Sequence, residues 1–571
     1  MKKSMMIQIL LSVCMLSQAQ DLVRITQEHR DRAKDIYLDL MEEAVMAYTP
    51  ERIEDYIARV DRDGIHEHGF PRLASNIGIL VAKGRIPQYK DLFVRLMDLA
   101  VREVPVARDR NQHRGTIGNE FSVKEMVGCI LECEKSGLFT KEQTDSWRRG
   151  LEDMKADDIY MYRPEPGDPV ARNWCVFGAA SECARVHAGI GGDMAYAEKY
   201  LSDQLRFFDE NGMYRDPNSP MVYDFVTRLQ YMAALSFGYD GPARERIEEQ
   251  LLKSALPTLQ MQSVTGEIPY GGRSNGFLHN ESFYAAVCEY YATWMKERGD
   301  LAMASRFKAA AHRASASICY WLSRKPVRHI KNRYPTETGY GCERYAYFDK
   351  YMVTMASWAY LAYRFADDSI PMARHREPAS TFVTGPDFHQ IMMNACGYTV
   401  QIDLDACKSY DTSGLGRFQR EGYSPVAGIH SPAPAENPHY RIDIPVTGGL
   451  ALSPGWDTYI LKKAQKGKVV LTNGKGAFWT IRLSRRGLSM TLEGEGMQTL
   501  NVPALAFDGE KHSDIRMEEE LLRVSFEGTD CIWTSNGKFS ENGNRYATRT
   551  GHLKHFQCSS DGRVTLKGKI L

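Results

Sequence analysis

The hydrophobic pattern of this 571-residue chain changes its period once, near residue 370. Before that point apolar residues recur at i, i+3, i+4 and i+7, as in "CVFGAASECARVHAGIG", a spacing typical of helices. Beyond about residue 375, alternating runs such as "HYRIDIPV" and "AFWTIRLS", separated by Gly, Asn and Asp, are typical of antiparallel strands and hairpins. Helices first and strands after predict an all-α domain followed by an antiparallel β-sandwich.

The helical part alternates runs that are apolar on more than one face with more polar runs, as buried and exposed helices do. The buried helices are expected to begin near Arg72, Glu120, Asn173, Val222, His279 and Tyr345. The intervals of 48, 53, 49, 57 and 66 residues each fit one helical hairpin. Six hairpins predict an (α/α)6 toroid whose inner helices begin at one common mouth.

The first residues have the pattern of a secretory signal peptide. Lys2 and Lys3 precede an apolar stretch, and Ser17 and Ala19 supply a small-x-small cleavage signal. Cys14 leaves a weaker lipoprotein alternative. The predicted organisation is a signal peptide over 1–19, a toroid catalytic domain over 20–372 and a β-sandwich domain over 376–571. A signal peptide implies a periplasmic or extracellular location.

Charge and cysteine content exclude several classes of protein. Lys+Arg and Asp+Glu balance at 72 each, which disfavours a general nucleic-acid binder. No later stretch reaches 18 uninterrupted apolar residues, so no membrane span is expected. Cys129 and Cys133 lie four apart in a helical pattern and are expected to be buried hydrophobes, not a bridge. No metal-binding motif is present, and we predict neither a metal nor a cofactor.

Polar, glycine-containing segments precede the predicted inner helices, among them "RGTIGNEFS", "PVARNW" and "GEIPYGGRSNGFLHNES". Free N–H groups at helix starts favour anions, and glycine lets a ligand approach the backbone closely. The sequence therefore predicts one pocket with several polar walls.

Two kinds of chemistry are open at this pocket. Glycoside hydrolysis needs two carboxyl groups, and those favoured among the helix starts are Glu120, Asp224, Glu281 and Glu343. Elimination from a uronate needs a group that damps the carboxylate charge, together with a base and an acid. Asn173, His279 and Tyr270 would serve in those roles. Each residue also has a purely structural explanation, as a helix cap or an ion-pair partner.

Arginine and aromatic residues at the same helix starts suit a carboxylated sugar, since a guanidinium fork matches a carboxylate and rings stack on sugar faces. The candidates for substrate binding are Trp174, Tyr223, Arg228, Arg273, Arg344 and Tyr345.

Three segments, "NGMYRDPNSPMVYDFVTRLQ", "GEIPYGGRSN" and "YGCERYAYFDKYM", resemble motifs of secreted bacterial carbohydrate-active enzymes. The resemblance is to glycoside hydrolase family 154, whose known activity is on terminal β-glucuronic acid, and to domain-of-unknown-function 2264 proteins. It covers about residues 100 to 430, including "VQIDLDACKSYDTSGLGRF". It implies a toroid with a C-terminal β-sheet domain. In architecture the chain more distantly resembles heparinase II/III-like lyases, but Arg172-Asn173-Trp174 stands where those usually show Asn-His.

The sequence thus predicts an exported glycoside hydrolase acting on oligo- or polysaccharides with uronic acid, in the manner of an exo-β-glucuronidase. The alternative is a polysaccharide lyase. A non-catalytic glycan-binding protein is a third class, disfavoured by the many ionisable groups at one mouth. The oligomeric state, including a homo-oligomer, is left open.

Overall fold

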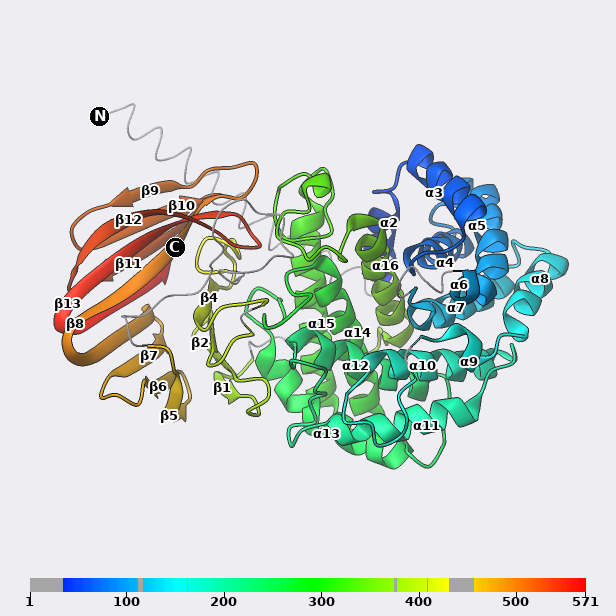
Figure 1. Cartoon of the computed structure of the whole chain (residues 1–571), viewed down its shortest axis with the longest axis horizontal. Helices are drawn as coiled ribbons and strands as arrows, with labels where there is room; N and C mark the ends of the chain where they lie inside the picture. Colours follow the sequence, from blue (N-terminus) through cyan, green and yellow to red (C-terminus); the bar gives the residue numbers. More distant parts are fainter. Residues whose placement is uncertain (1–33, 111–116, 162, 374–376, 408, 431–455) are drawn as a thin grey trace.

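The computed structural model describes residues 34–110, 117–161, 163–373, 377–407, 409–430 and 456–571. The predicted signal peptide and the predicted strand "HYRIDIPV" lie outside these residues. Helices come first and strands second, as the change of period predicts (Figure 1). Within the described part of the chain, no helix has the length and apolar character needed to cross a membrane.

Six inner helices form a closed ring. They are α4 (Gly69–Ala82), α7 (Val123–Ser136), α10 (Asn173–Ala188), α12 (Met221–Ser236), α14 (Leu278–Glu297) and α16 (Phe348–Phe365). Each packs against the next, and α16 returns to α4. The observed starts lie within three residues of the predicted ones. The predicted toroid is confirmed by this closure.

Six outer helices each pack on one inner helix. They are α5 (Lys90–Glu103), α8 (Lys141–Glu152), α11 (Met194–Gln204), α13 (Arg244–Met261), α15 (Leu301–Leu322) and α2 (Asp35–Val45). The first five follow their inner helix directly, whereas α2 packs on α16 from the other end of the domain. Further helices are α3 (Pro50–Asp63), α6 (Ala107–Arg110) and α9 (Ala156–Ile159).

Local sequence explains where some of these helices begin and end and which of their residues are buried. Helix α8 begins with a capping box, in which Thr140 and Gln143 satisfy each other's backbone N–H groups. Helix α7 ends at Gly137, which adopts the left-handed conformation that glycine accepts without strain. On α7, Cys129 and Cys133 are buried, as predicted, with sulfur atoms 4.0 Å apart.

The β-domain consists of two antiparallel sheets. The smaller contains β1 (Ser380–Val383), β2 (Gln390–Ala395), β3 (Tyr398–Asp403) and β4 (Gly414–Arg420), in that order. The larger runs in the order β5 (Ile460–Gln465), β6 (Lys468–Thr472), β7 (Phe478–Ser484), β8 (Gly487–Phe507), β13 (His552–Ile570), β11 (Thr529–Ser535), β10 (Leu521–Phe526) and β9 (Asp514–Met517). Strand β12 (Lys538–Ala547) also pairs with β13. Val400 and Phe418 share a core with Trp479 and Trp533 of the larger sheet, which confirms the sandwich.

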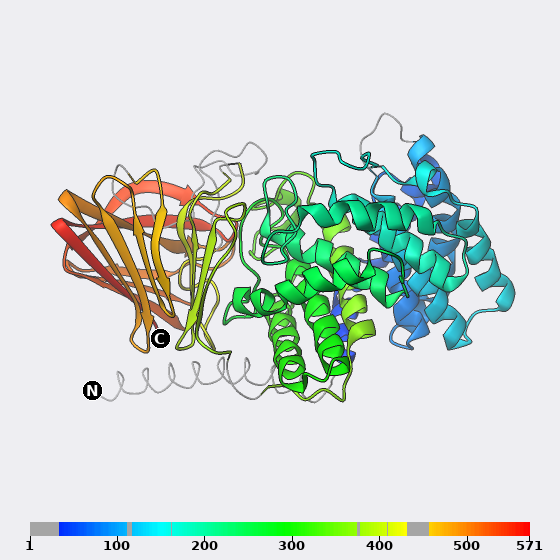
Figure 2. The ribbon, with the colours of Figure 1, turned by 90° about the horizontal axis from the view of Figure 1, so that it is seen from below.

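The smaller sheet lies between the larger sheet and the helical domain (Figures 1 and 2). Its second face is polar and binds the segment before α14. Arg417 donates to the Ile268 carbonyl at 2.7 Å, and Gln401 donates to the Tyr270 carbonyl at 2.7 Å. The β-domain therefore fixes the glycine-rich loop that the sequence singles out.

Candidate active site at the toroid mouth

Three inner-helix starts meet at the hydroxyl of Ser274, in the loop before α14. Its Oγ lies 3.1 Å from the phenol oxygen of Tyr223, in the first turn of α12. It also lies 2.6 Å from the phenol oxygen of Tyr345, just before α16. Tyr223 is half-buried and Tyr345 is 36% exposed, so both phenols lie at the edge of the protein interior. We call Tyr223, Ser274 and Tyr345 the tyrosine centre.

Ring contacts extend from this centre to the other helix starts. Tyr345 lies 6.2 Å from Tyr351 between ring centroids, and Tyr351 lies 6.5 Å from His68, which precedes α4. His68 lies 4.9 Å from Phe121, before α7, and Phe121 lies 4.5 Å from Trp174 in α10. Together with Tyr223 of α12 and Ser274 before α14, these rings connect all six inner-helix starts. The structure thereby brings Trp174, Tyr223 and Tyr345 together at one mouth.

His279, in the first turn of α14, packs between Phe277 and Tyr351. Its Nδ1 has no hydrogen-bond partner among the residues that the structure describes. Burial, followed by the positive charge of Arg72, holds the pKa of His279 well below its usual value. The imidazole is therefore neutral at physiological pH.

Arg273 lies beside the tyrosine centre. Its guanidinium carbon is 4.4 Å from the centre of the Tyr223 ring, and the side chain forms an ion pair with Asp216. Burial opposes its charge, but Tyr223 and Asp216 together raise the pKa of Arg273. The amide nitrogen of Asn173 donates to the same Asp216 carboxylate at 2.7 Å. Its Oδ1 accepts no hydrogen bond within the described chain.

Two basic side chains, Arg72 and Lys124, lie against aromatic rings near these helix starts. Arg72 of α4 forms a buried ion pair with Glu125 at 2.8 Å and lies 3.2 Å from Nδ1 of His68. Burial lowers the pKa of Lys124, beside Glu125, to about 7. Burial also lowers the pKa of His68 well below its usual value. His68, Lys124 and Tyr351 were not among the predicted site residues. Lys124 and Tyr351 look like ordinary residues of apolar helices, whereas His68 belongs to the polar segment "HEHGFPR" at the start of α4, from which no site residue was predicted.

The four favoured carboxylates are all buried and engaged. The Asp224 carboxylate lies 2.6 Å from Arg228, and both side chains are completely buried. Glu281 lies 2.8 Å from Lys331, which also pairs with Glu267. Burial raises the pKa of Asp224 and Glu281 despite these cations.

The remaining two carboxylates bind the protein as well. Glu343 pairs with Arg549 at 2.9 Å, and Glu120 accepts from the backbone N–H of Met161. All four therefore fix helix starts to their surroundings. Arg228, which we expected to bind a substrate carboxylate, instead donates from α12 to the hydroxyl of Thr258 in α13.

Two other predicted residues make no side-chain hydrogen bond or ion pair with the tyrosine centre in the described part of the chain. Tyr270 is 2% exposed and lies against the β-domain, with its hydroxyl 3.5 Å from the Gly414 carbonyl. Arg344 is exposed and lines a cavity of about 210 Å3 together with Glu343.

The β-domain also contributes to the mouth. Arg549 reaches Glu343 from the turn between β12 and β13. Asp411 accepts the backbone N–H of Gly272, two residues before Ser274, and burial together with Asp403 raises its pKa to about 8. Burial raises the pKa of Tyr410, and the positive charge of Arg273 opposes this rise. Tyr410 and Asp411 belong to the segment "VQIDLDACKSYDTSGLGRF", which carried part of the family resemblance and could have drawn attention to them. The sequence of this segment does not indicate that it faces the loop before α14.

No protein-family model and no curated protein matches this chain. Among solved structures, the heparan sulfate lyase HepC from Pedobacter heparinus is similar at 10% identity and a TM-score of 0.38, over 85% of this chain and 77% of that chain. Ara127N, a GH127 β-L-arabinofuranosidase from Geobacillus stearothermophilus T6, is similar at 11% identity and a TM-score of 0.37, over 93% and 98%. The GH127 β-arabinofuranosidase BT3674 gives 9% identity and a TM-score of 0.36, over 97% and 92%.

Likeness at these scores supports no conclusion about activity, and the toroid and sandwich described above rest on their own contacts. The resemblance to glycoside hydrolase family 154 stays a prediction.

Proposed function

We propose that this chain is an exported carbohydrate-active enzyme that cleaves uronic-acid-containing glycans by β-elimination. The observation that carries the proposal is the tyrosine centre, where two phenols share one serine hydroxyl beside a guanidinium group. The carboxylates that hydrolysis would use are each held in buried contacts instead. This reverses the order of the two chemistries favoured by the sequence alone.

Elimination begins with removal of the proton on C5 of the uronate. Tyr223 is the base that takes this proton, and the Arg273 guanidinium lies 4.4 Å from the centre of its ring. The Arg273 guanidinium beside the centre damps the charge of the uronate carboxylate, which makes the C5 proton more acidic, whereas the Asn173 amide donates to Asp216. Tyr223 and Asn173 are joined through Arg273 and Asp216, so their relative positions are fixed.

The second half of the reaction breaks the bond between C4 and the glycosidic oxygen. The C5–H electron pair becomes the C4=C5 double bond, and the C4–O pair leaves with the oxygen. Tyr345 protonates that oxygen; burial raises the pKa of Tyr345 well above 10 and keeps it a proton donor. Ser274 bonds both phenols, and through it the proton gained by Tyr223 returns to Tyr345. His279, whose Nδ1 has no hydrogen-bond partner among the described residues, is the second candidate for the base.

A hydrolase of the exo-β-glucuronidase kind is the second candidate, and one observation favours it. Asp411 has its pKa raised to about 8, so it carries a proton at neutral pH, as a general acid must. Its second oxygen has no hydrogen-bond partner in the described residues. Hydrolysis would require one of the buried carboxylates to become free as its partner.

The products decide between these functions. The mature protein is incubated with a panel of uronic-acid polysaccharides, and the ultraviolet absorbance of a 4,5-unsaturated uronate is followed together with mass spectrometry of the products. We expect an unsaturated product that is lost in Tyr223→Phe and retained in Tyr459→Phe, a change of a half-buried tyrosine of the β-domain. A saturated uronic acid would contradict elimination and support the hydrolase. Binding without any product would support the glycan-binding class.

A further inference from the structure

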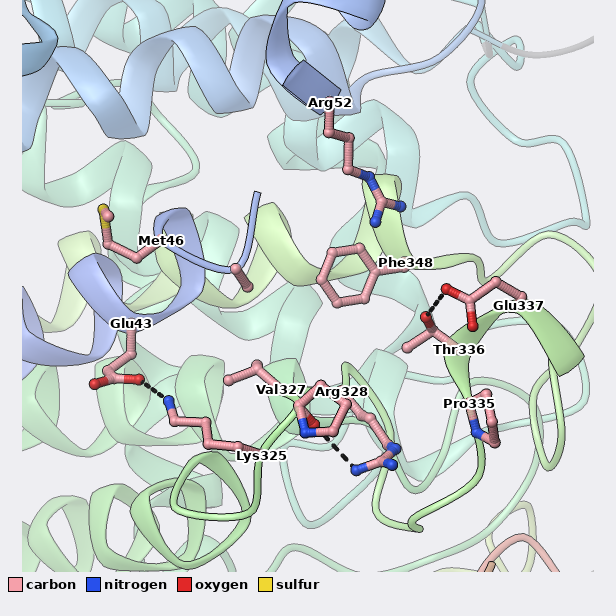
Figure 3. A pocket seen from close by; sticks show the side chains of 12 residues that line it. Glu43, Met46, Arg52, Lys325, Val327, Arg328, Pro335, Thr336, Glu337 and Phe348 are labelled. Carbon is pink, nitrogen blue, oxygen red and sulfur yellow. Dashed lines mark hydrogen bonds and ion pairs between the residues drawn. The ribbon is translucent and has the colours of Figure 1, made fainter. Parts of the chain in front are cut away.

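Two cavities lie side by side on the toroid rim next to the tyrosine centre. The larger, of about 410 Å3, is shown in Figure 3, and the smaller measures about 210 Å3. Arg52, Thr336, Glu337 and Phe348 line both of them, so the two cavities form one continuous groove. We call this the rim groove. Its volume suits sugar rings rather than a single ion.

The rim groove begins beside the residues proposed for catalysis. Glu343 and Arg344, which directly precede Tyr345, line its smaller cavity. Glu343 also accepts the backbone N–H of Ser274 at 2.9 Å. From there the groove passes Phe348 and reaches Lys325 and the other residues after α15. Glu343 therefore contacts both the tyrosine centre and the rim groove.

The basic residues of the groove differ in whether the protein neutralises them. Arg52 pairs with Asp349 at 2.6 Å, and Lys325 pairs with Glu43 (Figure 3). Arg328 and Arg344 have no carboxylate within 4.0 Å among the described residues, although each lines one of the two cavities. Neither forms an ion pair within the described residues, although the charges of Glu510, Asp508 and Glu337 act on Arg328.

Arg328 is held in place and keeps donors to spare. Its Nε donates to the Tyr334 carbonyl at 2.7 Å and its Nη1 to the Pro326 carbonyl at 3.0 Å. Nη2 makes no hydrogen bond within the described chain. Two carbonyl contacts fix the guanidinium plane without neutralising it, which is the arrangement that an arginine needs to bind an anion.

The remaining lining fits the sugar between two acidic groups. Phe348 presents a ring to the groove, with Arg52 4.7 Å from the ring centre. Glu337 lines both cavities and accepts from the Thr336 hydroxyl at 3.0 Å, so it offers an acceptor for sugar hydroxyls. Its negative charge opposes a uniformly anionic ligand and favours one whose acidic groups are separated by hydroxyl-bearing positions.

We propose that the rim groove binds the part of an acidic oligosaccharide adjacent to the uronate that is cleaved, with Arg344 and Arg328 each contacting an acidic group. This inference rests on the proposed function, because it uses the tyrosine centre as the place of cleavage. It adds that the enzyme recognises several sugars of its substrate. Longer oligosaccharides are therefore bound more tightly than a disaccharide.

The test compares an oligosaccharide of six residues, in which glucuronate alternates with a neutral sugar, with the corresponding disaccharide, on the full mature chain. Binding is measured by calorimetry and turnover by product formation, for wild type, Arg344→Gln and the double variant Arg328→Gln/Arg344→Gln. The matched control is Arg482→Gln/Arg516→Gln, which removes two exposed charges from the larger sheet. Arg344 is exposed and makes no side-chain hydrogen bond or ion pair with the described residues, so its single variant folds even where loss of Arg328 disturbs the loop.

We expect Arg344→Gln to weaken hexasaccharide binding by about tenfold, the value of one charge-assisted contact, and the double variant to weaken it by about a hundredfold, with disaccharide binding unchanged. The control should leave both unchanged. Equal hexasaccharide affinity in Arg344→Gln, the double variant and wild type overturns the rim groove while leaving the proposed function intact. Arginine-dependent binding without turnover supports the groove and contradicts the proposed function. Absence of any hexasaccharide binding by wild type overturns both.

Discussion

Arg549 of the β-domain and Glu343 of the helical domain form a two-point ion pair in which each side chain is 1% exposed. The same Glu343 carboxylate accepts the backbone N–H of Ser274. Ser274 in turn bonds both phenols of the tyrosine centre. The β-domain therefore positions the proposed catalytic groups through two intermediate residues, although Arg549 follows Glu343 by 206 positions.

Arg549→Gln should destabilise the protein by about 3–5 kcal/mol, because it leaves the Glu343 charge buried without a cation. It should also lower turnover at least about tenfold by releasing Ser274. Urea unfolding and initial rates measure the two effects. Arg563→Gln is the control, since its pair with Glu493 is exposed and should contribute less than about 1 kcal/mol. Equal stability of the two variants would show that the buried pair has no special role.

Removing either phenol oxygen should stop the chemistry without unfolding the protein. Tyr223→Phe and Tyr345→Phe each keep the ring and delete the proton-transfer group, so turnover should fall by about a hundredfold or more. Ser274→Ala should be milder, because the phenols remain. Rates of unsaturated product formation are the measurement, with circular dichroism as the check on folding. Full activity in both tyrosine variants would refute elimination at this centre.

Glu120→Gln and Glu281→Gln test the competing chemistry. If these residues fix helix starts, as their contacts with Met161 and Lys331 indicate, both variants should lose thermal stability but keep turnover within about tenfold of wild type. A hydrolase that used them would lose about a hundredfold or more. His279→Ala separates the two further, since it should harm only an eliminating enzyme. Loss of turnover in the glutamine variants at unchanged stability would favour hydrolysis.

Asp411 predicts a pH dependence of stability at the domain interface. Its folded pKa of about 8 lies above its ordinary value of 3.8, so the folded protein keeps a proton that the unfolded chain releases. The free energy of unfolding should therefore fall as pH rises from about 4 to about 8, by at most about 1.4 kcal/mol per pH unit from this group.

Asp411→Asn keeps an oxygen acceptor for Gly272 but cannot ionise. The variant should therefore gain stability relative to wild type as pH increases across the same window. Urea unfolding of both proteins near pH 5 and near pH 8 measures this difference. A stability difference that does not change with pH would show that Asp411 does not hold its proton in the folded state.

The sequence predicted the toroid because its evidence is local. The inner helices are apolar on several faces, and glycine-rich polar segments precede them, so their starts could be placed within three residues. The change to alternating strands is equally local. Convergence of the helix starts then brought Trp174, Tyr223 and Tyr345 together without any knowledge of side-chain contacts.

The roles of the carboxylates could not be read in the same way. Asp224 and Arg228 are four residues apart in one helix, and this spacing alone could have indicated their ion pair. Glu343 instead meets Arg549 across 206 positions, and Glu281 meets Lys331 from a different loop. Which carboxylate remains free depends on such distant cations, and a helical or alternating pattern contains no information about them.

The ring of inner helices closes only where α16 packs on α4, and α2 covers that junction from the beginning of the domain. Val45 at the end of α2 and Phe348 at the start of α16 are 303 positions apart. A chain emerging from the ribosome therefore holds α2 and α4 without their partner until almost the whole helical domain has been made. An open stack of hairpins could lose its last repeat and survive. This ring has no last repeat, so we expect truncation within α16 to prevent folding of the entire helical domain rather than one edge of it.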